Sequence, residues 1–447
     1  MYADLTKGSI TKSLLLFALP MTAGNLLQQF YNIADTLIVG RVLGSTALAA
    51  VGSAYSLMTF LTSIFLGLSM GSGALFSICR GKGDASALRS AVFHAFLLIM
   101  AITFVLNASV YLGLEPLLTL LNVPSDVRPG MRAYLLIIFA GLFATSLYNF
   151  FSCLLRAVGN STIPLCFLAV SAALNIGLDV WFVAGLSMGI GGAAWATIIA
   201  QYVSGIGILV YVCLRCRELL PNRASIRFDR DVLHEIFSLS SLTCLQQSVM
   251  NFGILMVQGL VNSFGTVVMA AFAAAVKIDS FAYLPVQDFG NAYSTFVAQN
   301  YGAGDTARIR QGTKQAFLCS ILFSIFVSIL VFAFAAPLMS LFVDAKEADV
   351  IAAGVRYLRI EGTFYFGIGC LFLFYGYFRA VRRAQISLLL TIISLGLRVL
   401  LSYLFSAHMG ETGIWISIPI GWILADAVGV WKLHKSNHKT DPAFCKQ

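Results

Sequence analysis

Long apolar stretches separated by short polar segments run along the whole chain. They supply the roughly 20 apolar residues that a helix needs to cross a lipid bilayer. The pattern predicts twelve such helices, at residues 13–39, 47–78, 90–114, 133–155, 163–186, 190–214, 234–262, 267–299, 315–343, 357–378, 385–407 and 412–431. Because a helix satisfies its own backbone hydrogen bonds inside lipid, we expect an all-α membrane protein.

The apolar pattern occurs twice. A shift of 221 residues superposes the second half of the chain on the first without a gap, and two extra residues near Lys346 then change the shift to 223. The matching residues include Gly83-Asp84 with Gly304-Asp305, Pro116 with Pro337, Tyr134 with Tyr357 and Arg156-Ala157-Val158 with Arg379-Ala380-Val381. Solute carriers are commonly built from internal repeats, so the duplication indicates transport.

Six predicted helices in each repeat determine how the repeats are related. Because six is an even number, each repeat begins and ends on the same side of the membrane, and the two repeats are expected to be parallel. The longest polar stretch, from Arg215 to Glu235, joins them. We predict an N-terminal lobe at residues 1–214, a linker at 215–233, a C-terminal lobe at 234–431 and a tail at 432–447.

Composition and charge agree with a membrane location. Hydrophobic residues make up 59% of the chain and charged residues only 11%, whereas soluble domains carry about 25% charge. Most of the 29 Lys and Arg residues fall in one set of alternate loops, which predicts that both termini are cytoplasmic. This distribution explains the net charge of +9 through membrane insertion, so we expect no nucleic-acid partner.

Several functions are excluded by what the sequence lacks. No G-x-x-x-x-G-K-[ST] motif is present, so ATP does not drive the protein. The predicted helices contain no nucleophile, base or metal cluster, and no ring of pore-lining residues, which argues against an enzyme and a channel. No cofactor is expected. Gly67-x-x-x-Gly71 is interpreted as a helix-packing motif of small residues.

Polar residues inside the first predicted helix lie on one face. Gln28, Asn32 and Asp35 are spaced four and three residues apart, and Asn25 continues the series, so all four fall within about one quadrant of a helix. Tyr31 lies beside this stripe. Polar groups in lipid are costly, and by default each is a candidate for function.

A second carboxylate lies on the fifth predicted helix, where Asn175 and Asp179 share a face. No buried Lys or Arg in the first half stands ready to neutralise Asp35 or Asp179, so each must be protonated, hydrated or bound to a cation. With the oxygens of Asn149, Asn175 and Thr197, the two carboxylates could bind Na⁺ or share a proton. Alternatively, the Asn149 and Thr197 side chains serve only to hold neighbouring helices together by hydrogen bonds.

The second half has a different set of polar residues. Met256 and Ser402 stand opposite Asp35 and Asp179, so the two lobes should differ chemically. Candidates for a substrate cavity, together with Gln28 and Asn32 of the first half, are Gln247, Asn251, Lys277, Asp279 and Asp288. Of these, Asp279 and Asp288 are candidates to hold a cationic substrate. An ion pair between Arg398 and Asp426 is an equally good explanation for those two residues.

Several short motifs carry a resemblance to a known family. They are Gly40-Arg41-x-x-Gly44, Gly81-x-Gly83-Asp84, Arg156-Ala157-x-Gly159-Asn160-x-x-x-Pro164 and Gly192-Ala193-Ala194-x-Ala196-Thr197. Each motif is weak alone, but their order and repetition are specific. Over essentially its whole length the chain resembles a multidrug and toxic compound extrusion (MATE) transporter of the bacterial branch.

The resemblance implies a fold and a mechanism. The fold is two parallel six-helix lobes around a central cavity, in a bacterial plasma membrane. The activity is export of organic cations and other amphiphilic drugs against inward flow of Na⁺ or H⁺. The family's ion site would correspond to Asp35, Asn149, Asn175, Asp179 and Thr197 with Tyr31 nearby, and Pro20 would be the helix hinge. Met256 replaces a carboxylate of some relatives, which puts a second ion site in doubt.

An alternative is a flippase for a lipid-linked saccharide, which is built on a related double bundle. Such a protein would need a cavity rich in Arg or Lys to bind pyrophosphate, and the predicted helices supply only Lys277 and Arg398. Export of cationic drugs is therefore the preferred interpretation. A bundle of this size needs no partner subunit, so we expect a monomer.

Overall fold

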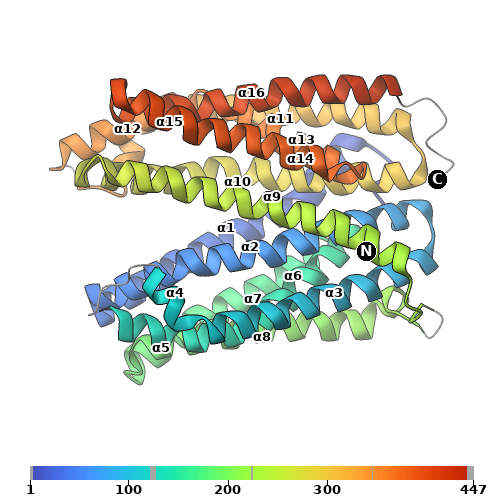
Figure 1. Cartoon of the computed structure of the whole chain (residues 1–447), viewed down its shortest axis with the longest axis horizontal. Coiled ribbons are helices and arrows are strands. Elements are labelled where there is room, and N and C mark those ends of the chain that lie inside the picture. The colour runs from blue at the N-terminus through green and yellow to red at the C-terminus, as the bar shows by residue number, and fades with distance from the viewer. Residues whose placement is uncertain (1–3, 121–126, 223–224, 345, 440–447) are drawn as a thin grey trace. The chain divides into compact units, whose positions relative to one another are not determined.

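The computed structural model describes residues 4–120, 127–222, 225–344 and 346–439, and within these ranges every regular element is a helix (Figure 1). Two short 3₁₀ helices, Phe139–Gly141 and Arg217–Leu219, and two π-helical segments, Val180–Gly185 and Ile392–Gly396, accompany the α-helices. The α-helices are α1 (Ile10–Leu43), α2 (Ser45–Lys82), α3 (Ala85–Leu112), α4 (Leu114–Leu120), α5 (Arg128–Ile138), α6 (Leu142–Ala157), α7 (Thr162–Asp179), α8 (Gly189–Arg215), α9 (Arg230–Asn262), α10 (Thr266–Ala303), α11 (Thr306–Ser340), α12 (Ala348–Gly362), α13 (Tyr365–Ala380), α14 (Ala384–Thr391), α15 (Leu397–Met409) and α16 (Glu411–Lys439).

The predicted all-helical membrane fold is confirmed. In the described part of the chain, eleven helical stretches are long and apolar enough to cross a membrane, and α12 with α13 forms a twelfth that is bent by 52°. The predicted starts at residues 133 and 357 were too late, since these helices begin at Arg128 and Ala348. Charged residues interrupt the apolar run there without interrupting the helical hydrogen bonds. The predicted tail is partly helical, because α16 continues to Lys439, and residues 440–447 lie outside the described part.

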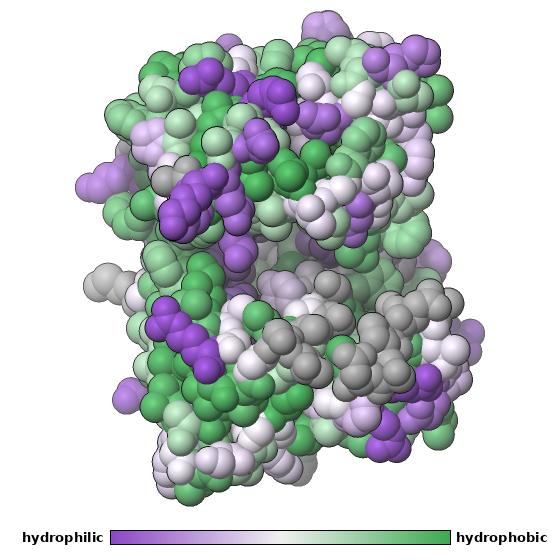
Figure 2. Space-filling model, turned by 90° about the vertical axis from the view of Figure 1, so that its left-hand side faces the viewer, coloured by the Kyte–Doolittle hydropathy of each residue, from purple (hydrophilic) through white to green (hydrophobic). Residues whose placement is uncertain are grey.

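Large apolar side chains cover much of the surface. Phe104 is 67% exposed, Leu112 87% and Leu341 75%. In a soluble protein such exposure would favour aggregation or a partner interface. Broad hydrophobic areas are visible in Figure 2, as expected for side chains that face lipid.

The two halves bend at matching positions. Gly113 separates α3 from α4, and 221 residues later Phe334 interrupts α11 with φ −104° and ψ 17°. Pro116 and Pro337 follow three residues after these points, and a proline removes a backbone donor and clashes with the preceding turn. Likewise, α13 begins 223 residues after α6 does. The sequence repeat is therefore also a repeat of backbone breaks.

The repeated Gly-Asp pairs end one helix and begin the next. Gly83 and Gly304 adopt left-handed φ of 73° and 74°, which a residue with a Cβ rarely does. Asp84 then caps α3 by accepting two backbone N–H bonds from its first turn, at 3.0 and 2.9 Å. Asp305 caps α11 by accepting the N–H of Arg308 at 2.8 Å.

Removing the cap of α3 is expected to destabilise the protein slightly. The variant Asp84→Ala should lose about 1 kcal/mol, because an N-cap side chain satisfies backbone donors that the helix cannot. Asp84→Asn keeps an acceptor oxygen and should be nearly neutral. Thermal melting of the detergent-purified variants checks this expectation. An equal loss of melting temperature in both variants would show that charge, and not capping, matters at this position.

Contacts divide the chain into two units that do not follow the order of the sequence. The first unit contains Leu19–Cys244, and the second contains Leu5–Ala18 together with the chain from Leu245 onward. The start of α1 therefore belongs to the second unit, and the first half of α9 belongs to the first. Pro20 stands directly after the change of unit in α1.

In the second unit, the N-terminal segment is held mainly by the guanidinium of Arg308. Arg308 on α11 donates to the carbonyl oxygens of Leu5, Lys7 and Gly8 at 3.3, 2.8 and 3.0 Å. The side chain of Asn300 also donates to Leu5 O, at 3.2 Å. These bonds fix the approach of the chain to α1.

In the first unit, the predicted linker is held in a similar way. Arg89 Nε on α3 donates to Glu218 O at 2.9 Å. The buried ring of His94 accepts the backbone N–H of Asp229 at Nε2, 2.9 Å away, while its Nδ1 faces Ser90 O at 2.8 Å. His94 is thus neutral and protonated at Nδ1, since Nε2 accepts a bond.

Backbones come very close where α2 meets the first half of α9. A Cβ added at Gly67 would collide with the backbone of Cys244, and one added at Gly71 would collide with the backbone of Ser240. The hydroxyl groups of Ser72 and Ser240 are 2.9 Å apart in the same contact. The interpretation of Gly67-x-x-x-Gly71 as a packing motif is confirmed.

Candidate ion-binding site

The two carboxylates of the first unit come from different helices. Asp35 lies on α1, and Asp179 is the last residue of α7, directly before the π-helical segment Val180–Gly185. Asp179 has no exposed surface, and Asp35 is half-buried. Single π-helical turns in α-helices often mark functional sites, because they change the direction of side chains.

The side chains of Asp35 and Asp179 are close enough to hydrogen bond with each other. A carboxylate can only accept, so a bond between two carboxyl groups requires a proton on one of them. Without that proton, two negative charges would face each other in an apolar environment, which only a bound cation could offset. The pair is therefore suited to bind a proton or a small cation.

The atoms around the pair leave acceptor oxygens without donors. Both carboxylate oxygens of Asp179, Oδ1 of Asp35 and Oδ1 of Asn175 are buried and accept no hydrogen bond from the described residues. No described Lys or Arg forms an ion pair with either carboxyl group. Buried acceptors are normally satisfied, and oxygens of this kind are the ligands that a hard cation prefers. The donor set fits Na⁺ or H⁺.

Asn175 and Thr197 join α7 to α8 beside the carboxylates. Asn175 is 97% buried, and its Nδ2 faces Thr197 Oγ1 at 3.4 Å. The Thr197 hydroxyl donates to Ala193 O in its own helix at 3.0 Å, so its lone pairs point away from that bond. The amide nitrogen of Asn175 is thereby directed at Thr197, which leaves its oxygen as the available ligand.

The remaining predicted residues differ in their contacts with the pair. Tyr31 hydrogen bonds with Gln28 and interacts electrostatically with Asp35. Asn149 donates to Thr145 O in its own helix at 2.8 Å, and within the described part of the chain no hydrogen bond joins it to either aspartate. Contacts among the described residues thus join Asp35 to Asp179 and Asn175 to Thr197, and they do not include Asn149.

Sequence reasoning missed Tyr134 as a site residue. This tyrosine of α5 is 93% buried and interacts electrostatically with both Asp35 and Asp179. Its phenol could donate to a carboxylate or supply an oxygen ligand. The match between Tyr134 and Tyr357 across the repeat was the available signal. The helix around Tyr134 is mostly apolar, so no stripe of polar residues marked this tyrosine as a candidate.

The predicted cavity residues fall in both units. Gln28 and Asn32 are half-buried in the first unit. In the second, Gln247, Asp279 and Asp288 are buried, Asn251 is half-buried and Lys277 is exposed. Asn251 donates to Gln247 O at 3.2 Å, as expected for polar residues four apart on one face.

The ion pair considered for Arg398 and Asp426 does not form between these described residues. Arg398 instead interacts electrostatically with Asp279 and Glu361, which lie on α10 and α12. The sequence could not show this, because the three residues come from three separate helices.

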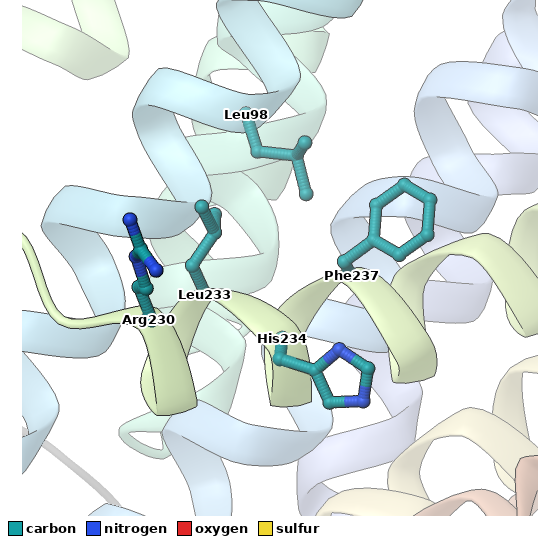
Figure 3. Close-up of a pocket in the computed structure, with 5 residues that line it drawn as sticks. All are labelled: Leu98, Arg230, Leu233, His234 and Phe237. Carbon is teal, nitrogen blue, oxygen red and sulfur yellow. The ribbon is translucent and has the colours of Figure 1, made fainter.

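A groove of about 300 Å³ lies elsewhere, on the first unit, between α3 and the start of α9 (Figure 3). Its lining is Leu98, Arg230, Leu233, His234 and Phe237. No predicted site residue is among them. The groove is therefore separate from the carboxylate pair.

Known proteins resemble the chain over nearly its whole length. The chain is 30% identical over 440 residues to a probable multidrug resistance protein of Bacillus subtilis, YpnP, and the alignment covers 97% of this chain and 98% of that protein. It is 22% identical over 428 residues to a multidrug export protein of Staphylococcus saprophyticus, MepA, covering 93% and 91%.

Solved structures share the fold. A MOP superfamily transporter from Pyrococcus furiosus superposes with a TM-score of 0.91 at 22% identity and covers 98% of both chains. A MATE transporter of Vibrio cholerae, VcmN, superposes with a TM-score of 0.88 at 24% identity and covers 97% of this chain and 98% of its own.

The sequence profile of the MatE family matches the chain twice, at residues 20–181 and 242–404. The two matches cover corresponding parts of the two repeats, as a duplicated transporter requires. Together with the fold and the full-length relatives, they show that the chain belongs to the MatE family of multidrug and toxic compound extrusion transporters.

Proposed function

We propose that the chain is a secondary active antiporter, which exports organic cations and other amphiphilic drugs in exchange for Na⁺ or H⁺ at Asp35 and Asp179. The observation that carries this proposal is the pair of adjacent carboxyl groups without a fixed positive neighbour among the described residues. Such a pair needs a mobile positive charge, and an imposed ion gradient can supply it. The names of the relatives, which are multidrug resistance and export proteins, support the substrate class.

Coupling follows from competition between two states of the protein. If ion and drug favour different states, each must weaken the binding of the other by the same factor. We assign the ion to Asp35 and Asp179, with oxygens from Asn175 and Thr197. Pro20 is the proposed hinge, since a proline interrupts the hydrogen bonds of α1 at the point where that helix changes unit.

Substrate contact is assigned to polar side chains that keep some exposed surface. Of the predicted cavity residues, Gln28, Asn32, Asn251 and Lys277 meet this condition. Both termini are proposed to be cytoplasmic in a bacterial plasma membrane, from the distribution of Lys and Arg over alternate loops. The chain is proposed to act as a monomer.

The proposal is tested with the purified protein in proteoliposomes, using ethidium as an organic cation. An outward-directed ethidium flux should be accelerated by an opposing gradient of Na⁺ or of H⁺, imposed one at a time. The gradient that ethidium in turn dissipates identifies the coupling ion. Ethidium movement that ignores both gradients would contradict antiport.

The variant Asn175→Leu should weaken the coupling ion without abolishing transport. It removes one neutral oxygen from the site and keeps both carboxylates, so the ion concentration for half-maximal exchange should rise about tenfold, the effect of about 1.4 kcal/mol. The maximal rate at saturating ion should change less. The matched control is Asn107→Leu, which removes an amide of α3 that donates to Phe139 O and belongs to no proposed site. A rise that is no larger for Asn175→Leu than for the control would exclude Asn175 as a ligand.

A further inference from the structure

The second unit contains its own buried acidic pair, which the proposed coupling mechanism does not use. Asp279 on α10 and Glu361 on α12 are 96% and 94% buried and hydrogen bond with each other. The phenol of Tyr365 donates to Asp279 Oδ1, and Tyr357 hydrogen bonds with both acids. As in the first unit, two adjacent carboxyl groups here require a compensating positive charge.

In this unit the positive charge belongs to the protein. Arg398 is 91% buried on α15 and interacts favourably with both Asp279 and Glu361. A guanidinium keeps its charge at every pH that a protein survives. Burying it is costly unless negative groups offset it, so the acids and the arginine stabilise one another. The first unit offers no equivalent, because no described Lys or Arg interacts electrostatically with Asp35 or Asp179.

The repeat register relates this cluster to the proposed ion site. With the shift of 223 residues, Arg398 corresponds to Asn175 and Tyr357 to Tyr134. Both Asn175 and Arg398 lie near a π-helical segment, Val180–Gly185 in one unit and Ile392–Gly396 in the other. The position of a neutral ligand in the first unit is thus taken by a permanent cation in the second.

We propose that Arg398 is a tethered counter-ion, which takes the place of a mobile metal cation in the second unit. Arg398 offsets one of the two negative charges of Asp279 and Glu361, and the proton that their mutual hydrogen bond requires offsets the other, so this cluster binds no Na⁺. Each chain then has a single Na⁺ site, at Asp35 and Asp179. This inference rests on the proposed function of that site.

Several buried polar atoms of the cluster lack hydrogen-bond partners, and they indicate what removal of the guanidinium would leave uncompensated. Asp279 Oδ2 and Glu361 Oε2 are buried and accept no hydrogen bond from the described residues, and Arg398 Nε has no acceptor. Among the described residues, Arg398 forms no ion pair within 4 Å. If asparagine replaced the arginine, the acids would keep unsatisfied oxygens and gain an amide oxygen like that of Asn175. Such a set of oxygens suits a monovalent cation.

The experiment measures equilibrium binding of radioactive Na⁺ to the purified full-length protein at alkaline pH, where protons compete least. All variants carry Asp179→Asn, which disables the first site. With Arg398 intact, no saturable Na⁺ binding is expected. Adding Arg398→Asn should create saturable binding, and adding Arg398→Lys, which keeps a fixed charge, should create none. Size-exclusion chromatography verifies that each variant is folded.

Two results would overturn the inference. One is saturable Na⁺ binding by the Asp179→Asn variant, in which Arg398 is intact, if this binding disappears when Asp279→Asn is added. The second unit would then bind a mobile ion beside its arginine. This test needs no change at Arg398, so it holds even if Arg398→Asn does not fold. The other is a folded Arg398→Asn variant that binds no Na⁺. Failure of the proposed function is seen separately, as ethidium export by the wild-type protein that ignores ion gradients.

Discussion

Gradient-driven export is expected to disappear when Asp179 is replaced by asparagine. The variant has nearly the same shape, but its side chain can neither release a proton nor attract a cation, so the ion loses its main electrostatic partner. We expect ethidium export driven by a Na⁺ or H⁺ gradient to fall at least about tenfold, because each 1.4 kcal/mol of lost interaction is a factor of ten. Asp35→Asn should have the same effect, since the two carboxyl groups interact directly and are proposed to form one site.

Two controls separate lost coupling from lost folding. Exchange of ethidium against ethidium, with no ion gradient, should persist in Asp179→Asn, because substrate binding is not altered. Asp426→Asn makes the same chemical change in α16, which belongs to the second unit, and should retain gradient-driven export. If both Asp35→Asn and Asp179→Asn export ethidium against a gradient at the wild-type rate, the carboxylate pair is not the coupling site.

The second large effect is expected at the contact between α2 and α9. Gly71→Ile should destabilise the protein by about 1–3 kcal/mol or more, because the new side chain has no space beside the backbone of Ser240. The helices would have to separate, and the Ser72–Ser240 hydrogen bond would be lost with the contact. Thermal melting and the monodisperse fraction in size-exclusion chromatography measure the loss.

Gly259→Ile is the matched control, since this α9 position has no heavy atom within 4 Å of an added Cβ. Both variants replace glycine by isoleucine within a helix, so their difference reports packing and not helix propensity. Equal melting temperatures would mean that α2 and α9 adjust to the larger residue, and that close backbone approach is not required there.

The overall architecture could be predicted from the sequence because lipid imposes a simple rule. A run of apolar residues long enough to cross the membrane must be helical, and this rule finds every span from α1 to α16. It fails at helix starts that carry charge, such as Arg128 and Ala348, because hydropathy records only the part of a helix that contacts lipid. Bends were missed for a similar reason. Helix α11 is kinked at Phe334, three residues before Pro337, yet neither residue disturbs the apolar pattern.

The candidate site shows a different limit. Helical spacing placed Asn175 and Asp179 on one face, and the absence of a buried basic residue identified the aspartates as unusual. Spacing along one helix cannot show which residues of other helices it meets. Tyr134 was therefore missed. For the same reason Arg398 was matched with Asp426, although it interacts with Asp279 and Glu361.

The first helix of each repeat begins in the unit of the other repeat, and this bears on how such a chain could arise. Leu5–Ala18 packs with the second unit, and residues 230–244 of α9 pack with the first. In a stand-alone protein with one six-helix repeat, the start of the first helix would have no partner within its own repeat. It could pack on a second copy instead, as exchanged segments do in domain-swapped dimers. Gene duplication and fusion would then convert a swapped pair into one polypeptide without any change of contacts.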